Sequence, residues 1–345
     1  MALYNASLSA GGSGSAVACP LGKVVADNTW NSESTLPYSF AHSSAVVLNN
    51  ELHILGSSRD KTAHYKFNGT SWESVSTLPY TFYSGSAVVY NDEIHILGGD
   101  TTYTKHYKFN GTSWESVSTL PYEFYQGSAV VYNSEIHVLG GNSYYTKHYK
   151  FNGTSWESVS TLPYKFYDGS AVVYNDEIHI LGSGNSNDRK GHYIYNGTSW
   201  EYVPFFPYSF YNGSAVVYND EIHILGGSSG RTNHYAFNGT SWRKIYDIPY
   251  NFYYGSAVVY NDEIHILGGN ESTTKHYTVK YDNRHIATML PKGTHIMLSD
   301  NEDINYVKNA EKVSSNIAEV TETGYVEVLA TLPEIDDIKG YLTFY

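Results

Sequence analysis

The sequence predicts an all-β protein in which six similar units form the blades of a closed β-propeller. Three observations support this fold class: a unit of about 42 residues recurs six times, each copy carries one tryptophan, and helical periodicity is absent from the repeats. The tryptophans are Trp30, Trp72, Trp114, Trp156, Trp200 and Trp242, spaced 42, 42, 42, 44 and 42 residues apart. A fixed period of this length indicates a repeat array, and several short strands per period are typical of a propeller blade.

One unit, taken from Gly85, contains four short runs that predict antiparallel strands. The runs are residues 86–90, 93–97, 106–109 and 113–117. The first, Ser-Ala-Val-Val-Tyr, is apolar enough to predict a strand buried on both faces. Asn91-Asp92 predicts a tight turn, because both residues tolerate positive φ. Asn110-Gly111 predicts a hairpin between the third and fourth strands.

The order of the repeated elements predicts how the ring closes. Trp30 precedes the first Ala-Val-Val strand, whereas the last one, residues 257–259, has no tryptophan after it. We therefore expect residues 29–32 to form the outer strand of the blade that begins at Ser256. This arrangement leaves no open sheet edge. The rival closing strand, residues 286–289, would leave Trp30 without a blade.

The repeats divide the chain into three predicted segments: an N-terminal segment (1–28), the propeller (29–282) and a C-terminal β-rich module (283–345). The module shows alternating runs, such as residues 324–328, and we expect the N-terminal segment to complete it. Both terminal segments meet the propeller at a junction between third and fourth strands. We therefore expect them on the face that carries the turns after strands one and three.

Composition excludes several classes of function. The formal net charge of −13 over 345 residues argues against nucleic-acid binding, which favours a basic surface. The single cysteine, Cys19, cannot form an internal disulfide. The first residues lack a basic segment followed by an apolar one, so no secretory signal is predicted. No apolar stretch is long enough to predict membrane insertion.

The loops after strands two and four differ between copies, while the other turns hardly change. They are rich in Tyr, Ser, Asn and Gly, a composition that suits recognition of sugars or proteins because tyrosine offers a rigid amphipathic contact. The competing interpretation is that loop tips drift without constraint. The candidate ligand-binding residues all lie in these loops: Tyr83, Tyr125, Tyr167, Tyr211, Tyr253, Tyr254, Tyr103, Tyr144, Tyr145, Arg189, Gln126 and Asp168.

No catalytic residue, metal site or cofactor is predicted. Twelve of the fifteen histidines repeat in register, on the second and third strands of each unit. Such regularity favours a structural histidine, partly buried and hydrogen-bonded between blades, over a metal ligand, and no HExxH or Cys/His cluster is present. Repeated pairs such as Asp92-Glu93 indicate hairpin chemistry rather than an acid–base pair. The Asn-Gly-Thr triplets indicate turns rather than glycosylation sites.

The repeats resemble a known family. Gly98-Gly99, Tyr107 and Trp114, like Gly140-Gly141, Tyr149 and Trp156, follow the order and spacing of the kelch repeat. The resemblance covers residues 29–282, and two copies depart from it with Gly56-Ser57 and Gly182-Ser183. The phrase Ser-Thr-Leu-Pro-Tyr-x-Phe-Tyr-x-Gly-Ser-Ala-Val-Val-Tyr-Asn is similar to repeats in kelch-containing tail or baseplate proteins of phages that infect Gram-positive bacteria.

This resemblance implies a non-enzymatic virion component, made in the host cytoplasm without a signal peptide. Residues 1–28 and 283–345 would attach it to other tail or baseplate proteins, and the varied loops would bind a host-surface glycan or protein. The sequence is compatible with a homo-oligomer.

Two alternatives stay open, because kelch propellers also include adaptors and enzymes. An intracellular kelch scaffold usually carries a helical oligomerisation domain, and none is visible in this sequence. A sugar mutarotase would need export and unlike polar residues near the axis, which the sequence does not reveal. A copper oxidase of this fold needs a cysteine cross-linked to tyrosine, and Cys19 lies outside the repeats.

Overall fold

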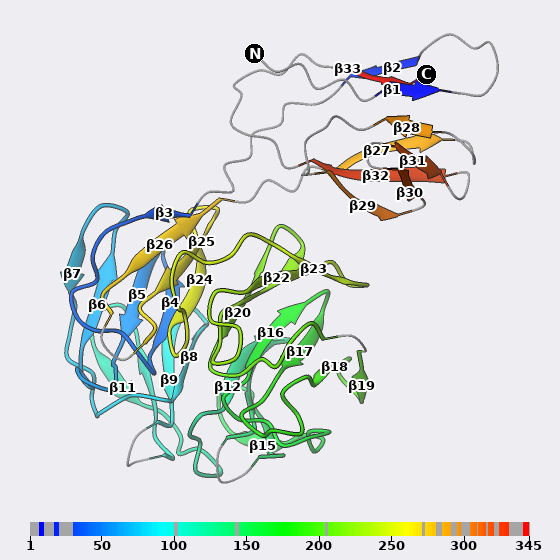
Figure 1. Cartoon of the computed structure of the whole chain (residues 1–345). Helices are drawn as coiled ribbons and strands as arrows, with labels where there is room; N and C mark the ends of the chain where they lie inside the picture. Colours follow the sequence, from blue (N-terminus) through cyan, green and yellow to red (C-terminus); the bar gives the residue numbers. More distant parts are fainter. Residues whose placement is uncertain are drawn as a thin grey trace. The chain divides into compact units, whose positions relative to one another are not determined.

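The protein divides into two units, residues 30–279 and a terminal unit that joins residues 1–29 to residues 280–345. The computed structural model describes residues 30–280, except 100–102, 142–144, 204–205 and 271–272. In the terminal unit it describes the strands alone. Figure 1 shows the first unit as a ring of small sheets, coloured in sequence order from blue to yellow.

Each blade of the first unit is a four-stranded antiparallel sheet, and five of the six blades use consecutive strands. Blade one contains β4 (Ser44–Leu48), β5 (Glu51–Leu55), β6 (His64–Phe67) and β7 (Trp72–Ser74). Blade two contains β8 (Ser86–Tyr90), β9 (Glu93–Leu97), β10 (His106–Phe109) and β11 (Trp114–Ser116). Blade three contains β12 (Ser128–Tyr132), β13 (Glu135–Leu139), β14 (His148–Phe151) and β15 (Trp156–Ser158). Blades four and five are β16 (Ser170–Tyr174), β17 (Glu177–Leu181), β18 (His192–Tyr195), β19 (Trp200–Tyr202); and β20 (Ser214–Tyr218), β21 (Glu221–Leu225), β22 (His234–Phe237), β23 (Trp242–Lys244). The predicted all-β fold with six blades is confirmed.

The sixth blade joins the two ends of the repeat region. Its strands are β24 (Ser256–Tyr260), β25 (Glu263–Leu267), β26 (His276–Val279) and the N-terminal β3 (Asn31–Ser32). Strand β3 pairs antiparallel with β26, placing Ser32 opposite Tyr277. Closure by an N-terminal strand is therefore confirmed. The rival segment lies in β27 (His285–Leu290), which pairs with β32 (Gly324–Ala330) in the terminal unit.

The prediction that the first strand of each unit is buried on both faces holds only in part. In β8, Val88 and Tyr90 are buried, whereas Ala87 and Val89 are only partly covered. Both faces nevertheless pack between blades: Val88 and Tyr90 lie in the core shared with the third blade, and Ala87 and Val89 pack against the core shared with the first. The second strand, β9, is the one buried on both faces, with Ile94 and Leu97 completely inaccessible.

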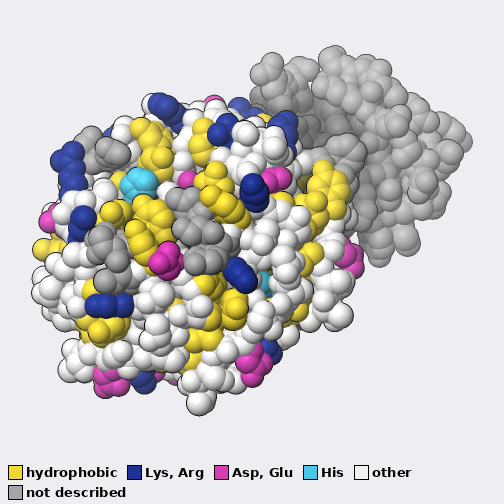
Figure 2. Space-filling model, turned by 90° about the horizontal axis from the view of Figure 1, so that it is seen from below, with side chains coloured by type: hydrophobic (Ala, Val, Ile, Leu, Met, Phe, Trp, Pro, Cys, Tyr) yellow, Lys and Arg dark blue, Asp and Glu magenta, His cyan; other side chains and the backbone are white. Residues whose placement is uncertain are grey.

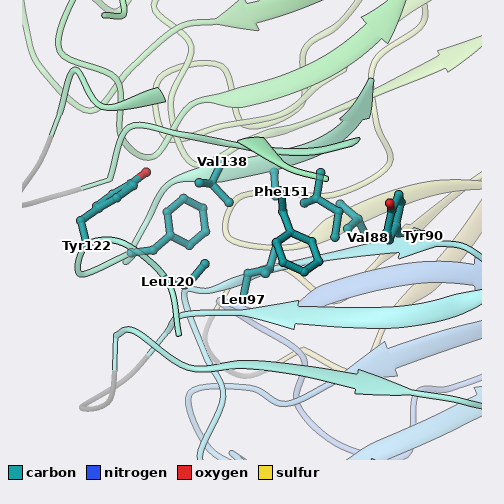
Figure 3. Packing of buried hydrophobic residues seen from close by; sticks show 10 residues of the cluster. Val88, Tyr90, Leu97, Leu120, Tyr122, Val138 and Phe151 are labelled. Carbon is teal, nitrogen blue, oxygen red and sulfur yellow. The ribbon is translucent and has the colours of Figure 1, made fainter. Parts of the chain in front are cut away.

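The hydrophobic core lies between blades rather than within one. Figure 3 shows one such interface, where Val88 and Leu97 of the second blade meet Val138 and Phe151 of the third. The connecting segment inserts Phe124, which is fully buried, between the two sheets. Because a blade cannot bury its apolar faces alone, each blade depends on both neighbours for its stability.

The first glycine after each second strand allows close contact between blades. Gly98 has φ +62°, and a Cβ there would lie 2.1 Å from the carbonyl oxygen of Phe124. The second glycine is less constrained. In the departures from the repeat, Ser57 and Ser183 keep negative φ, and the Ser57 hydroxyl accepts the backbone N–H of Asp60 at 2.7 Å.

A buried tyrosine hydroxyl closes each of these glycine turns. The Tyr80 hydroxyl donates to the carbonyl oxygen of Gly98 at 2.8 Å, and the equivalent bond recurs in the other blades. We expect Tyr80→Phe to reduce the free energy of unfolding by about 1–2 kcal/mol, because the Gly98 carbonyl is left without its donor. Chemical denaturation would measure this, with Tyr202→Phe as the control, since Tyr202 is 58% exposed. Equal effects of the two variants would contradict the assignment.

The hairpin predicted at Asn110-Gly111 is present between β10 and β11. Phe109 pairs with Trp114 across a four-residue turn, in which the Asn110 N–H donates to the Ser113 carbonyl at 3.3 Å. The Asn110 side-chain oxygen accepts the N–H groups of Thr112 and Ser113 at 2.9 Å. Asparagine is therefore present to cap the turn, and only Gly111 has positive φ. The Asn91-Asp92 turn does have positive φ at both residues, as predicted.

In the terminal unit, strands from both ends of the chain pair with one another. Strand β1 (Ser7–Ser9) pairs with β28 (His295–Met297), and β2 (Val17–Pro20) pairs with β33 (Tyr341–Phe344). The remaining strands are β29 (Ile304–Lys308), β30 (Ala310–Ser314) and β31 (Ile317–Val320). Within the described part of the whole chain, no helix has the length and apolar character needed to cross a membrane.

Candidate binding site at the propeller axis

Six residues, one from each connection between blades, form a closed ring of backbone hydrogen bonds around the axis. They are His42, Ser84, Gln126, Asp168, Asn212 and Tyr254. Each donates its backbone N–H to the carbonyl oxygen of the preceding member at 2.7 or 2.8 Å, and His42 closes the ring by donating to Tyr254. All six have positive φ, between 53° and 63°. Non-glycine residues rarely adopt this conformation, which persists where the surroundings enforce it and is often associated with function.

The local sequence explains why the chain adopts this ring. Two residues before each ring position, a phenylalanine such as Phe82 is completely buried and anchors the connection. The residue that follows each ring position is usually glycine. A Cβ at Gly85 would lie 2.7 Å from the carbonyl oxygen of Leu97, so a side chain there would collide with the second strand. Anchor and glycine recur in five of the six copies, whereas the ring residue is different in every copy.

The ring residues and their neighbours line a cavity of about 110 Å³. Below it, serine hydroxyls link adjacent blades: Ser86 accepts the N–H of Ala129 at 3.1 Å, and the same bond recurs in four other blade pairs. The backbone therefore supplies a uniform polar base. The chemical differences within the cavity come from the six ring side chains and from Ser43, which stands where the other five blades have glycine.

Several ring side chains interact with their surroundings. The His42 ring stacks on Tyr254 with centroids 3.8 Å apart, and the Ser84 hydroxyl lies 3.4 Å from His42 Nδ1. Asn212 Nδ2 donates to the Ser228 hydroxyl at 3.1 Å. Asp168 is the single acid of the ring, and burial raises the pKa of its carboxyl group to about 7. The site therefore holds a carboxyl group that changes charge near neutral pH, beside uncharged donors and acceptors.

Tyrosines surround this cavity. Tyr83, Tyr125, Tyr167, Tyr211 and Tyr253 each precede a ring residue and are half-buried. A residue from the loop after a second strand covers each of them. Three are covered by cations: Lys61 Nζ lies 4.5 Å from the Tyr83 ring centroid, the Arg189 guanidinium carbon 4.2 Å from that of Tyr211, and the Arg231 guanidinium carbon 4.9 Å from that of Tyr253. Two are covered by tyrosine rings, with centroids 5.5 Å apart for Tyr103 and Tyr125 and 5.2 Å apart for Tyr145 and Tyr167. The backbone carbonyl of each covering residue accepts the N–H of a buried phenylalanine, which fixes its position.

The surface of the propeller is mixed in chemistry. Figure 2 shows one face of the propeller, on which yellow side chains, a class that includes tyrosine, form patches among white polar surface. Dark-blue Lys and Arg side chains are scattered between the patches rather than gathered in one block. Aromatic surfaces with dispersed charges suit a polyhydroxylated ligand, or a protein surface of mixed chemistry, better than a polyanion.

The structure brings eleven of the twelve predicted binding residues into this one assembly, as ring residues, tyrosines or covering residues. Tyr144 lies outside the described residues. Sequence reasoning did not assign binding to His42, Ser84, Asn212, Lys61 or Arg231. His42 was hidden because the first copy reads Phe-Ala-His-Ser where the others read Phe-Tyr-x-Gly-Ser. Alignment on the preceding phenylalanine would have revealed it.

The repeated histidines are hydrogen-bonded within blades, so the prediction of bonds between blades is wrong. In the second blade His95 Nδ1 lies 2.8 Å from His106 Nε2, and both rings are buried. Contact with the next blade is aromatic: the His106 ring meets Phe151 and Trp156 edge-on at 5.1 and 5.7 Å. Equivalent histidine pairs occur in all six blades.

The sixth blade shows how such a pair is satisfied. Trp72 Nε1 donates to the Ser34 hydroxyl at 2.9 Å, and that hydroxyl lies 3.3 Å from His276 Nδ1. His276 Nε2 lies 2.8 Å from His265 Nδ1, and His265 Nε2 lies 3.2 Å from the Tyr260 carbonyl oxygen. The Tyr260 carbonyl can only accept, so His265 carries a proton on Nε2. With both rings neutral, His276 donates from Nε2 to His265 Nδ1 and accepts at Nδ1 from the Ser34 hydroxyl.

Burial keeps these rings neutral, lowering the pKa of His265 to about 4 and that of His276 to about 3. The nitrogens of this pair are occupied by protein hydrogen bonds. Among the residues that the structure describes, no group of three or more His, Cys, Asp or Glu is placed to hold a metal ion.

Comparison with known proteins defines the class of the fold. No protein-family model matches the chain, and no curated protein matches it. The solved structure of YjhT is similar, with a TM-score of 0.62 and 15% sequence identity, over 78% of this chain and 98% of that one. Likeness at this identity shows a shared fold alone. The protein is thus a six-bladed β-propeller with a second, terminal unit.

Proposed function

We propose that this chain is a non-enzymatic binding protein of the kelch type, a phage tail or baseplate component that recognises a host-surface glycan or protein. Recognition would take place at the axial ring and the tyrosines around it. The terminal unit would attach the propeller to other virion proteins. The kelch-like glycine, tyrosine and tryptophan pattern, and the similarity to phage tail repeats, support this assignment.

One observation carries the proposal: a nearly invariant backbone ring presents six different side chains to one cavity. The ring side chain differs in every blade, although its backbone conformation and hydrogen bonds are the same in all six. The surrounding tyrosines provide large contact areas that lose little conformational entropy on binding. A repeated scaffold that carries different side chains around one cavity is typical of a recognition surface.

The points where the chain enters and leaves the propeller support the same arrangement. Strand β26 ends at Val279 and β3 begins at Asn31, at the position where the other blades have their Asn-Gly-Thr turns. Successive strands run in opposite directions, so these turns lie on the face opposite the ring. The chain therefore enters and leaves the propeller on the face opposite the ring. Several copies on one particle would combine weak single sites through avidity.

A specific observation favours a second candidate, a sugar-converting enzyme. The axial cavity holds unlike polar residues, including the carboxyl group of Asp168, whose pKa of about 7 suits proton transfer near neutral pH. An NMR assay of anomer exchange in reducing sugars distinguishes the two functions. Exchange faster than in buffer, and lost in Asp168→Asn, would favour the enzyme.

Removing three neighbouring tyrosines tests the binding role. We expect the triple variant Tyr83→Ala, Tyr125→Ala, Tyr167→Ala to lose about 2–6 kcal/mol of ligand-binding free energy, because hot-spot aromatics dominate such interfaces. A glycan array and pull-down from host cell walls would measure it. Tyr202→Ala, at an exposed position on β19, is the control. An unchanged binding profile in a folded triple variant would refute the assignment of this face.

A further inference from the structure

The fourth blade differs from the other five beside the axial ring. Its loop between β17 and β18 spans two more residues than the corresponding loops, as the 44-residue tryptophan spacing indicates. This loop carries Arg189, whose guanidinium carbon lies 4.2 Å from the ring centroid of Tyr211. It also passes over Asp168, because a Cβ at Gly184 would lie 3.1 Å from Asp168 Oδ2. The longer loop thus brings a cation and the ring's acid into one sector.

These two charged groups are not paired with each other. Within the described residues, no hydrogen bond or ion pair is made by the Asp168 carboxyl group, and Arg189 Nε is buried without an acceptor. Both groups act on the Tyr167 phenol. Burial is the main cause that raises the pKa of this phenol, the Asp168 charge adds to the rise, and the Arg189 charge opposes it. Tyr145 and Asp188 also act on this phenol. Two further titratable groups lie beside these residues: Lys165, whose Nζ is 5.6 Å from the Tyr145 ring centroid, and Tyr211, against which Arg189 packs.

Desolvated polar groups without partners are unfavourable, so a ligand that supplies partners gains affinity. A carboxylate acceptor (Asp168) beside a guanidinium donor (Arg189) matches a ligand with two adjacent hydroxyls. One hydroxyl donates to the carboxylate, and the other accepts from a guanidinium N–H. A cation would be repelled by Arg189 and an anion by Asp168. The half-buried Tyr167 ring offers a flat surface for the C–H face of a sugar.

We propose that Asp168, Arg189 and Tyr167 form the subsite that discriminates between ligands, and that it takes a neutral pyranose through two adjacent hydroxyls. This inference rests on the proposed binding function and specifies its ligand. The Asp168 carboxylate accepts one sugar hydroxyl, the half-exposed guanidinium of Arg189 donates to the next, and the ring of Tyr167 stacks on the sugar. The other five ring residues have no carboxyl group, so they modulate ligand preference without adding a negative charge.

Asp168→Asn is a well-matched test, because Asn212 occupies the equivalent ring position with φ 57° against 53° for Asp168. The variant should therefore fold. Saturation-transfer NMR and calorimetric titration would use methyl glycosides of glucose, galactose, mannose and rhamnose, with methyl glucuronide as the anionic probe and glucosamine as the cationic probe. We expect at least one neutral glycoside to bind the full chain, and affinity to fall at least tenfold in Asp168→Asn and in Arg189→Gln. The control, Asp92→Asn on a distant hairpin, should bind as the wild type does.

A pH profile adds an independent measurement. The donated hydroxyl favours ionised Asp168, so wild-type affinity should fall as pH decreases from 8.5 to 6.5, and Asp168→Asn should show a flatter profile. His42 shares the ring, so the difference between wild type and variant, rather than the wild-type profile alone, reports Asp168.

Three outcomes would overturn the inference. If a neutral glycoside binds wild type and Asp168→Asn equally, the subsite is wrong while the binding function stands. If only the glucuronide or glucosamine binds, the ligand class is wrong. If no sugar binds but a host cell-wall protein does, the inference fails and the protein-binding form of the proposed function survives.

Discussion

Between pH 6.5 and about pH 5, the propeller is expected to lose most of its stability. Twelve histidines are buried as neutral hydrogen-bonded pairs, and burial lowers their pKa values, to about 4 for His95 and about 3 for His106. The other ten show the same shift: His53, His64, His137, His148, His179, His192, His223, His234, His265 and His276. In the unfolded chain these groups titrate near their ordinary value of about 6.5.

The direction of the effect follows from proton binding. Above pH 6.5 the histidines are neutral in both states, so their pairing stabilises the fold fully. Below it the unfolded chain takes up protons that the folded chain cannot, which costs about 1.4 kcal/mol per histidine for each pH unit. Twelve such groups outweigh a typical domain stability of ~5–15 kcal/mol within about one pH unit. Asp168 acts in the opposite sense, because its raised pKa favours the folded state as pH falls, but it is one group against twelve.

Tryptophan fluorescence measures this transition in the propeller alone, because all six tryptophans lie between residues 30 and 242. Urea unfolding at pH 8, 7, 6 and 5.5 gives the free energy of unfolding, and its slope against pH counts the protons taken up. The double variant His95→Gln, His106→Gln should reduce that count by about two. Equal stability at pH 7 and pH 5 would show that the histidines are not held neutral.

Gly98→Ala is expected to destabilise the propeller by about 3–5 kcal/mol, among the largest effects of a single substitution. Two causes act together. The residue has φ +62°, which a side chain disfavours, and the added Cβ would lie 2.1 Å from the carbonyl oxygen of Phe124. That carbonyl accepts the N–H of Gly99 at 2.9 Å, so the second and third blades cannot separate without losing the bond. Urea unfolding of the variant measures the loss.

Gly111→Ala separates the two causes. Gly111 also has positive φ, +92°, but a Cβ there would meet nothing within 4 Å. It should therefore lose only the conformational part, about 1–2 kcal/mol. Should the two variants unfold at the same denaturant concentration, close packing between blades would not be the reason for the glycine at position 98.

Much of the architecture could be predicted from sequence because the repeat reports it directly. The tryptophan period gives the number of blades, and the position of Trp30 before the first Ala-Val-Val strand gives the closure by β3. The turn at Asn91-Asp92 follows from the ability of these residues to adopt positive φ. Each of these features depends on local chemistry or on simple counting.

Features that depend on the third dimension were missed. His95 and His106 meet diagonally, since the register sets His95 opposite Lys108 and Leu97 opposite His106. The sequence gives their positions but not that diagonal contact. The axial ring was equally hidden, because Gln126 and Tyr254 are not residue types that predict positive φ. Only the hydrogen bonds between successive blades hold them there.

The near-identity of the interfaces between blades has an evolutionary consequence. Each buried contact, from the Phe124 anchor to the Tyr80 hydroxyl bond, recurs with the same partners around the circle, so a blade is not tied to one neighbour. Recombination between similar gene segments could exchange, duplicate or reorder blades and still yield a folded product with six of them. Every such event would reshuffle the order of side chains around the central opening. New specificities would then arise by rearranging existing modules, faster than by waiting for point mutations.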